Sequence, residues 1–269
     1  MEPTKMKYDI RNSENARQTL ISLTGVSLPI WKQYVERESE FEYIEDLVEY
    51  VASNYGKIPK DYRDINFIYF HITTSANNCA SFQKHGILDL PHSYMCPDSE
   101  LRSFLDKHNV YIDLNNELLI YGGKKFDIHY GPCPIENSIK YDCWLIGRKF
   151  YYDFTICGFL SASDIRSYGG NVHDRPEILM DIDRLLQTKF SEEWASTHIA
   201  YKVVAQVKGS DILGEDDIDE KDKVMHYLTD AYYTAFGGPD EKILLMQNGV
   251  CVPPTNILEI KPLACWKKR

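Results

Sequence analysis

Three apolar, strand-like segments each carry polar side chains that could bind a ligand or take part in a reaction. These side chains are an imidazole, three hydroxyls and a carboxylate, namely His71, Thr73, Ser161, Ser163 and Glu241. Imidazole and hydroxyl groups donate and accept hydrogen bonds, and a fixed carboxylate can stabilise positive charge that develops in a transition state. Each residue alone is typical of an ordinary structural position. The order of the three segments along the chain therefore carries the functional interpretation.

Other kinds of catalytic or binding site have little support in the sequence. There is no G-x-S-x-G motif, and the eight histidines show neither H-E-x-x-H nor another paired ligand spacing, so we expect no metal site. Residues 121–125 contain two glycines and two lysines but depart from the P-loop pattern. The acidic segment 215–222 lacks the spacing and the central glycine of a calcium-binding loop. The seven cysteines form no C-x-x-C pair, which favours reduced thiols in an intracellular protein.

Composition and charge limit the classes of partner. The chain has 269 residues with 30 Lys and Arg against 40 Asp and Glu, so its net charge is 30 − 40 = −10. Such an acidic chain does not coat nucleic acid or anionic membrane through bulk charge, although a locally basic site is compatible with it. Residues 1–20 contain no apolar stretch typical of a signal peptide, and no segment has the length of a membrane span. We expect a cytoplasmic protein with no membrane partner.

The apolar pattern predicts both helices and strands, without regular βαβ alternation. Apolar residues recur at three- and four-residue spacing over 14–55, which predicts helix, and Gly56 marks a boundary. Residues 65–73 predict a buried strand, and the tyrosine-rich segments 110–121 and 141–163 are expected to be extended. Further helices are expected at 75–85, 98–107, 174–188 and 220–236, and further strands at 198–207, 241–246 and 257–261. This mixture favours the α+β class over a doubly wound parallel sheet.

The order of the three polar segments resembles that of the ADP-ribosyltransferase fold. "IYFHITTSANNCASFQKHGILDL" is similar to the opening of the DarT-type and poly-ADP-ribose-polymerase-like branch, which has a His-x-Thr strand and a helix ending in Gly-Ile-Leu. A Gly-Phe-x-Ser-x-Ser strand follows, and "DEKILLMQNGVCVPPTNILEI" is similar to the closing segment of such enzymes. The resemblance implies a split β-sheet core with an NAD cleft in a catalytic domain of residues 61–269. The N-terminal helical segment, residues 1–60, lies outside it.

The resemblance also implies a role for each matched residue. Glu241 matches the catalytic glutamate, which bonds the nicotinamide-ribose 2′-hydroxyl and stabilises the oxocarbenium-like ribosyl cation. His71 matches the first-strand histidine that bonds the adenosine-side ribose. NAD is the co-substrate, and no metal is required. The other implied pocket residues are Ile72, whose backbone would grip the nicotinamide amide, Thr73, Ser161 and Ser163, with Phe159 and Tyr168 as candidates for the ring that stacks on nicotinamide.

The chain departs from the family pattern in three ways, which bear on the acceptor. It combines the first-strand His with Ser-x-Ser, where many protein-modifying members carry Arg. It has Pro239 where arginine- or asparagine-modifying members carry Glu or Gln. The middle tyrosine pair of the diphtheria-toxin-like group is not clearly placed. Together with the DarT-like opening, Pro239 favours a nucleobase in DNA or RNA as the acceptor, and a protein acceptor is the alternative.

The favoured hypothesis is a mono-ADP-ribosyltransferase of toxin or phage-defence type, and a cognate antitoxin is a possible partner. An RNA 2′-phosphotransferase of the same fold would need a set of His and Arg residues that is not found here. A non-catalytic binding or inhibitor module is the remaining alternative, and the presence of both His71 and Glu241 counts against it. Candidate local contacts to nucleic acid are the basic residues Lys124, Lys125, Arg148, Lys149, Arg166 and the tail 267–269.

Overall fold

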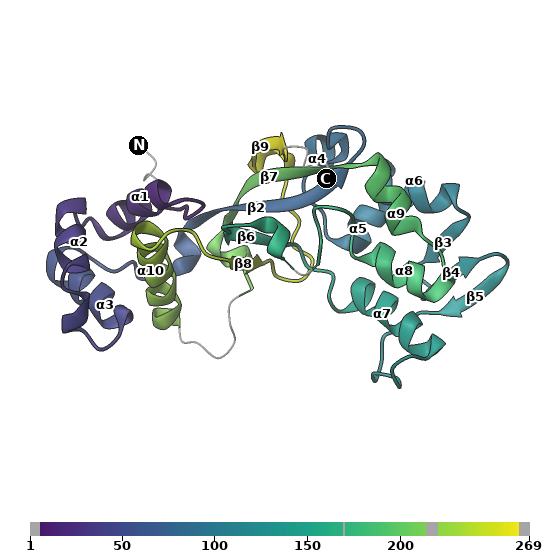
Figure 1. Cartoon of the computed structure of the whole chain (residues 1–269), viewed down its shortest axis with the longest axis horizontal. Helices are drawn as coiled ribbons and strands as arrows, with labels where there is room; N and C mark the ends of the chain where they lie inside the picture. Colours follow the sequence, from purple (N-terminus) through teal and green to yellow (C-terminus); the bar gives the residue numbers. More distant parts are fainter. Residues whose placement is uncertain (1–5, 169, 214–219, 264–269) are drawn as a thin grey trace. The chain divides into compact units, whose positions relative to one another are not determined.

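The computed structural model describes residues 6–168, 170–213 and 220–263 (Figure 1). It has a mixed α+β fold with largely antiparallel sheets, which confirms the predicted α+β class. Six strands form one sheet in the order β8-β6-β2-β7-β9, with β1 pairing in parallel with β2. Their bounds are β1 Lys7–Tyr8, β2 Asn66–Ser75, β6 Cys157–Ser161, β7 Ile199–Lys208, β8 Lys242–Leu245 and β9 Ile257–Pro262. A second sheet has the order β3-β4-β5, with β3 Val110–Asp113, β4 Leu118–Tyr121 and β5 Lys124–Asp127.

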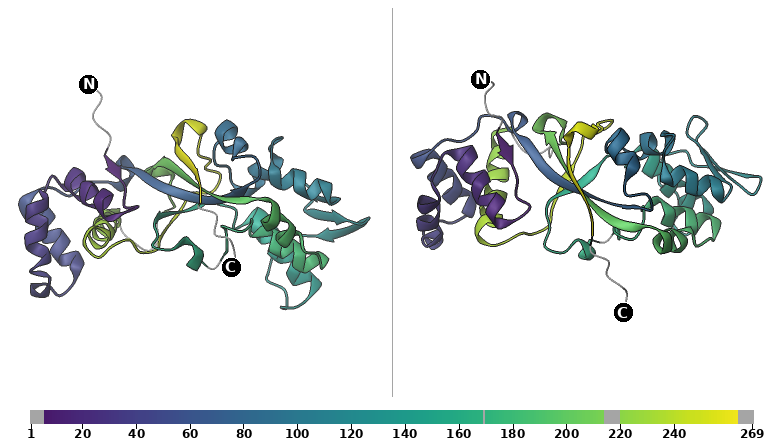
Figure 2. Two further views of the ribbon diagram at one scale, coloured as in Figure 1. Left: turned by 45° about the horizontal axis from the view of Figure 1, so that its top comes forward. Right: turned by 90° about the horizontal axis from the view of Figure 1, so that it is seen from above.

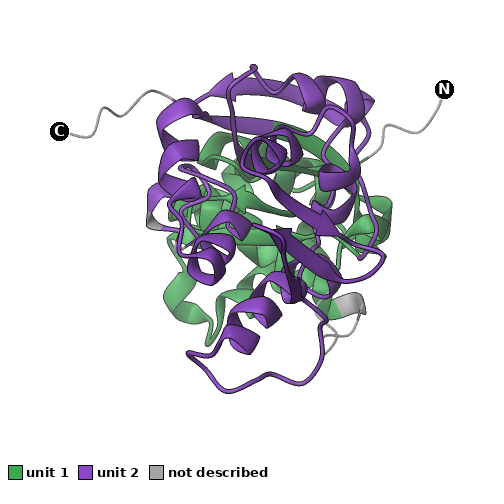
Figure 3. Ribbon diagram, turned by 90° about the vertical axis from the view of Figure 1, so that its right-hand side faces the viewer, with its two compact units in different colours: residues 1–71, 157–164, 204–247 green, residues 72–156, 165–203, 248–269 purple. Residues whose placement is uncertain are grey.

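The chain folds into two compact units, and neither of them is a continuous stretch of sequence (Figure 3). Unit 1 comprises Met1–His71, Cys157–Asp164 and Val204–Gln247, and unit 2 comprises Ile72–Ile156, Ile165–Val203 and Asn248–Arg269. The strands β2 and β7 therefore each begin in one unit and end in the other. No boundary of either unit falls at residue 60, where the sequence suggested a division between domains.

Unit 1 joins the N-terminal helices to a helix from near the other end of the chain. The helices α1 (Ser13–Thr24) and α3 (Ile44–Tyr55) both pack against α10 (Glu220–Phe236), and α2 (Leu28–Val35) lies beside α3 (Figure 2). Tyr8 donates a hydrogen bond from its hydroxyl to the Tyr227 carbonyl at 2.9 Å. The expected helical region 14–55 is confirmed as these three helices. The apolar faces of α1 and α3 are covered by α10, so residues 6–60 help to complete the core of unit 1.

The caps of α1 explain where that helix begins and ends. The side chain of Asn12 accepts a hydrogen bond from the backbone N–H of Asn15 and so satisfies one of the first free donors. Gly25 ends the helix in a left-handed conformation with φ 75°, and its N–H bonds to the Ile21 carbonyl. Helix α10 presents buried residues at helical spacing toward α1 and α3, namely Val224, Leu228, Ala231, Tyr232 and Ala235.

Unit 2 has its own hydrophobic core, built from helices on the three-stranded sheet. The core helices are α5 Leu90–Met95, α6 Glu100–Lys107, α7 Ile139–Tyr151, α8 Ile178–Leu186 and α9 Phe190–Thr197, and α4 Ala80–His85 precedes them. The largest side chains buried in this core include Trp194, Phe150 and Tyr94. The hydroxyl oxygen of Tyr94 accepts the backbone N–H of Ile112 at 2.9 Å, which joins α5 to β3.

The prediction of extended structure over 141–163 is wrong for its first part, because Ile139–Tyr151 forms α7. The side chain of Ser138 caps this helix by accepting the Tyr141 N–H. Residues at helical spacing on one face are buried, namely Cys143, Ile146, Gly147 and Phe150. The tyrosines and tryptophan that suggest a strand by composition lie on the remaining faces of a helix. Burial of the apolar face has therefore overridden residue propensity.

Other predicted elements agree with the structure to within a few residues, with three exceptions. The segment 110–121 is two strands. The helix expected over 75–85 begins only at Ala80, because β2 continues to Ser75, and the helix expected over 174–188 begins only at Ile178. Helix α9 was not expected. Its N-terminus is held by Asp183, whose carboxylate accepts the backbone N–H groups of Phe190 at 2.7 Å and Ser191 at 2.9 Å. Most of the acidic segment 215–222 and the basic tail 267–269 lie outside the described residues.

Asp181 on α8 leads to a prediction about stability and pH. Burial raises the pKa of this carboxyl to about 6, and the charge of Glu177 adds to the effect, while Lys149 opposes it. A carboxyl group with a raised pKa binds more protons in the folded state than in the unfolded state, so it destabilises the protein increasingly as pH rises from about 4 to about 6, and fully above that. We expect Asp181→Asn to raise the free energy of unfolding at pH 7.5 by about 1 kcal/mol after allowance for solvent screening.

The same substitution should give almost no gain at pH 4, where the carboxyl is protonated in the folded protein. Chemical unfolding of the parent chain and the variant at both pH values measures this difference. An equal gain at both pH values would contradict the prediction.

Candidate functional site

The three polar segments identified in the sequence are neighbours in one sheet. Strand β6 pairs in antiparallel fashion with β2 on one side and with β8 on the other. Phe159 lies opposite Phe70 on β2 and opposite Ile243 on β8. The strands that carry or adjoin His71, Ser161 and Glu241 are thus consecutive in unit 1. Sequence order alone does not determine this adjacency, because the segments are separated by about 80 or more residues.

His71 is half-buried at the end of the part of β2 that belongs to unit 1. Its Nδ1 lies 2.8 Å from the carbonyl oxygen of Cys157 on β6. A carbonyl only accepts hydrogen bonds, so Nδ1 carries the proton, and the neutral ring offers Nε2 as an acceptor. Burial lowers the pKa of His71, against the opposing effect of this hydrogen bond, and so favours the neutral ring. The residue is therefore an oriented, uncharged imidazole.

Ser161 lies at the end of β6 and is fully buried. Among the described residues, its Oγ has no hydrogen-bond partner. A buried hydroxyl without a partner is costly, so such atoms often mark a position where a ligand or a water binds. Ser163 differs from the expectation that both serines share one face of a strand. It lies in a bend beyond the end of β6 and is exposed.

Tyr69 is a candidate that the sequence analysis did not single out. It lies two residues before His71 on β2 and is fully buried, and its hydroxyl also lacks a partner among the described residues. Burial raises the pKa of this hydroxyl well above its usual value, so it stays protonated and can donate a hydrogen bond. Gly158 makes room for the ring, because a Cβ there would lie 2.4 Å from Tyr69 Cδ2. Two sequence signals could have indicated Tyr69: it lies two residues before His71, on the same face of the strand, and the facing strand has a glycine.

Glu241 directly precedes β8 and is exposed. Its backbone N–H donates a hydrogen bond to Asp240 Oδ1 at 2.8 Å. In the described part of the chain, the carboxylate of Glu241 makes no ion pair or hydrogen bond, whereas the next residue, Lys242, pairs with Asp230 on α10 at 2.6 Å. The register between β6 and β8 shifts between Phe159 and Ser161, beside Lys242. Such bulges redirect side chains at the end of a strand, here next to Glu241.

The remaining predicted residues are placed as follows. Phe159 is buried, and its ring stacks on Phe70 with the centroids 5.4 Å apart. Ile72, Thr73 and Tyr168 belong to unit 2. There Ile72 is buried and the other two are half-buried. The structure thus brings His71, Phe159 and Ser161 onto paired strands of unit 1, with Glu241 at the start of the adjacent strand.

Unit 2 contains a cavity of about 690 Å³ that none of the predicted site residues lines. Its polar wall includes Lys84, Asp98, Glu100, Lys107 and His198, and Phe104 supplies an aromatic surface. His198 stacks on Trp194 with the ring centroids 3.6 Å apart, and burial lowers its pKa. Two lysines and two carboxylates line the wall, so no single charge dominates this cavity. It is a concave site separate from the residues predicted from the sequence.

The basic residues considered for nucleic-acid contact are not equivalent. Lys124 and Lys125 are exposed on β5. In contrast, Lys149 lies 3.0 Å from Asp153 and 2.9 Å from Glu177, so its charge is compensated within the protein. Arg148 lies 3.8 Å from Asp153 and over the ring of Trp144. The pair on β5 therefore remains the better candidate for a local phosphate contact.

Comparisons with other proteins supply no relative for this chain. No family model, no curated protein and no solved structure matches it. None of the helices in the described ranges combines the length and the apolar character needed to cross a membrane.

Proposed function

We propose that the chain is a mono-ADP-ribosyltransferase that transfers ADP-ribose from NAD to a macromolecular acceptor, favoured to be a nucleobase in DNA or RNA. The observation that carries this proposal is the adjacency of β2, β6 and β8, which bear or adjoin His71, Ser161 and Glu241. A sheet that holds these three segments side by side is what the sequence resemblance requires.

The polar atoms of unit 1 fit a ligand rich in hydroxyl groups. Ser161 Oγ and the Tyr69 hydroxyl are buried without partners among the residues that the structure describes, and His71 is an oriented neutral ring. The hydroxyls of a ribose can both donate to and accept from such groups. The carboxylate of Glu241 is not engaged by a cation in the described residues. NAD would supply the ADP-ribosyl group, and Glu241 would stabilise the positive charge that develops as nicotinamide leaves.

The acceptor is proposed from the sequence and from charge. Pro239 stands where many arginine- or asparagine-modifying members of the resembled family carry Glu or Gln, and the net charge of −10 limits nucleic-acid contact to a few phosphates. We therefore expect binding of nucleic acid to weaken only mildly with salt. A protein acceptor is the second candidate, and a non-catalytic module that binds NAD is the third.

Labelling from NAD tests this proposal. The chain is incubated with NAD carrying a label on its adenylate half, together with single-stranded DNA, RNA or a protein extract, and nicotinamide release is followed in parallel. Label in a nucleic-acid fraction supports the proposal. Label in the protein fraction alone would mean that the acceptor is a protein and not a nucleobase. Binding of NAD without nicotinamide release in the presence of all three acceptors would contradict the enzymatic function.

Substitution of His71 gives a prediction that separates binding from the bond-breaking step. We expect His71→Ala to raise the KM for NAD roughly 10-fold, the effect of one lost hydrogen bond to an oriented group, with a smaller effect on kcat. Steady-state rates of nicotinamide release over a range of NAD concentrations measure both constants. A large fall in kcat with an unchanged KM would contradict the assignment of His71 to ribose binding.

A further inference from the structure

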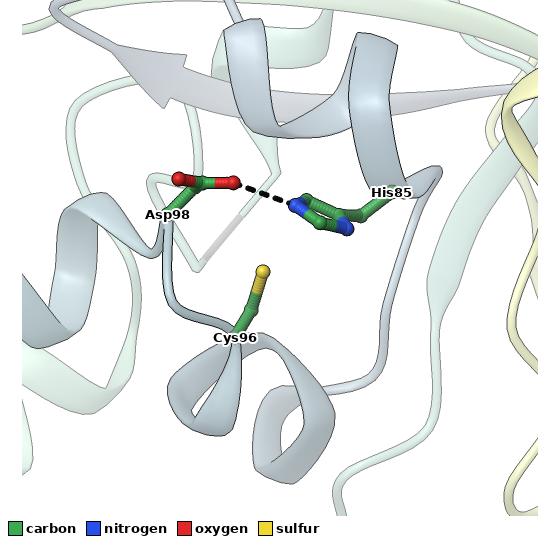
Figure 4. A group of neighbouring side chains, drawn as sticks. All are labelled: His85, Cys96 and Asp98. Carbon is green, nitrogen blue, oxygen red and sulfur yellow. Dashed lines mark hydrogen bonds and ion pairs between the residues drawn. The ribbon is translucent and has the colours of Figure 1, made fainter.

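Three donor side chains meet in unit 2 where short helices begin and end. His85 is the last residue of α4, Cys96 caps the C-terminus of α5, and Asp98 precedes Ser99, the N-cap of α6. One ligand-type atom from each residue lies within 4.8 Å of the other two. Figure 4 shows the three side chains pointing toward one another, with the sulfur facing the hydrogen bond that joins His85 to Asp98.

We propose that His85, Cys96 and Asp98 form a Zn²⁺-binding site. Imidazole nitrogen, thiolate sulfur and carboxylate oxygen are the three donor types that zinc takes in proteins. In a tetrahedral zinc site, bond lengths of about 2.0 to 2.3 Å place the donor atoms roughly 3.3 to 3.8 Å apart. His85 Nε2 and Asp98 Oδ2, now 2.7 Å apart, would need to open by about 0.6 Å to reach this spacing. The donor atoms of all three residues already lie within 4.8 Å of one another, so at most about 1 Å of closure is needed elsewhere.

The surroundings of the thiol support this assignment. Cys96 is 8% exposed, and in the described part of the chain its sulfur makes no hydrogen bond. The carboxylate and the imidazole are more accessible, and Asp98 lines the cavity of unit 2. An ion from solvent could therefore reach the exposed Asp98 carboxylate first and then bind the buried Cys96 sulfur. Three protein ligands leave a fourth position for water or for a group in the cavity.

The sequence did not indicate this site because its spacing follows no zinc motif. His85 is separated from Cys96 by ten residues, and only one residue separates Cys96 from Asp98. The three residues are brought together by the turn of the chain at α5. Two interactions fix this turn. Ile87 forms a β-bridge with Val252, and the Asp89 side chain caps α5 by accepting the His92 N–H.

Lys84 provides a specific test, because its ammonium competes with a cation. Lys84 Nζ lies 2.7 Å from Asp98 Oδ2, the oxygen that also bonds His85 Nε2. A bound Zn²⁺ must displace this ammonium from the oxygen or tolerate its repulsion. Removing the charge in Lys84→Met should therefore tighten metal binding by roughly 3- to 10-fold, the magnitude of an exposed ion pair.

Titration of the metal-free chain with Co²⁺ and then with Zn²⁺ tests the proposal. Tetrahedral Co²⁺ with a thiolate ligand gives strong visible bands and a charge-transfer band, and Zn²⁺ should displace it at one ion per chain. We expect Cys96→Ser to abolish the charge-transfer band and Asp98→Asn to weaken binding at least 10-fold. Circular dichroism of the metal-free variants establishes that they fold. Asp98 is exposed, so Asp98→Asn should fold normally. It therefore tests the proposal even if Cys96→Ser does not fold.

The matched control is Cys251→Ser. Cys251 belongs to another group of donors, with Asp89 and His92, at the opposite end of α5. The Cys251→Ser substitution should leave the Co²⁺ spectrum and the stoichiometry of metal binding unchanged. Loss of the band in Cys251→Ser but not in Cys96→Ser would overturn the proposal. So would the absence of one-to-one binding by the parent chain, or unchanged affinity in Lys84→Met.

Discussion

Glu241→Gln is expected to lower the rate of NAD-dependent transfer at least 100-fold, by analogy with the loss of an oriented group that stabilises transition-state charge. Glutamine keeps the size of the side chain and its ability to form hydrogen bonds but removes the negative charge. Because Glu241 is exposed and its carboxylate has no partner in the described residues, the substitution should leave the fold and its stability unchanged. Nicotinamide release at saturating NAD measures the effect.

The adjacent carboxylate provides the matched control for this experiment. Asp240 is also exposed, and its Oδ1 accepts the backbone N–H of Glu241. Asp240→Asn preserves that acceptor while removing one negative charge, so it should retain activity to within about 3-fold. A general effect of negative charge near β8 would lower the activity of both variants equally. Full activity in Glu241→Gln would show that the carboxylate has no catalytic role.

The sequence predicted the elements of unit 1 better than their arrangement. The strands near His71, Ser161 and Glu241 were expected from runs of aromatic and β-branched residues, which is a local signal. Their adjacency depends on pairing between segments far apart in the chain, which no local pattern encodes. The packing of α10 on α1 and α3 is also long-range. It explains why the first residues of the chain and residues 204–247 belong to one unit.

The candidate site was predictable in part, for related reasons. The sequence indicated His71 and Ser161 as polar residues on apolar strands. It did not indicate Tyr69, because a tyrosine in an aromatic-rich strand is normally a core residue. Tyr69 is distinguished by a buried hydroxyl that has no partner within the described ranges. Ser163 was expected on the face of Ser161, but β6 ends at Ser161 and the alternation ends with it. The shift in register beside Lys242 had no signal in the sequence.

Helix α7 shows how propensity can mislead, and it gives the second large expected effect. Gly147 lies in the middle of this helix, where alanine would ordinarily be favoured by about 1 kcal/mol. Here a Cβ would lie 1.9 Å from the carbonyl oxygen of Ile128. That carbonyl belongs to a buried residue whose own N–H bonds to the Glu117 carbonyl at 2.9 Å, so the backbone cannot move away without breaking other contacts.

Gly147→Ala should therefore destabilise the protein by at least about 2 kcal/mol instead of stabilising it, because an overpacked contact with backbone outweighs the gain in helix propensity. Thermal and chemical unfolding measure the difference. Lys140→Ala is the control on the same helix, since Lys140 is exposed and its replacement should change the free energy of unfolding by no more than about 0.5 kcal/mol. A Gly147→Ala chain as stable as the parent would mean that α7 and the segment after β5 do not approach as closely as described. The close approach accompanies the burial of Ile146, Phe150 and Ile128 in one core, and it is this burial that opposes the strand preference of the segment's composition.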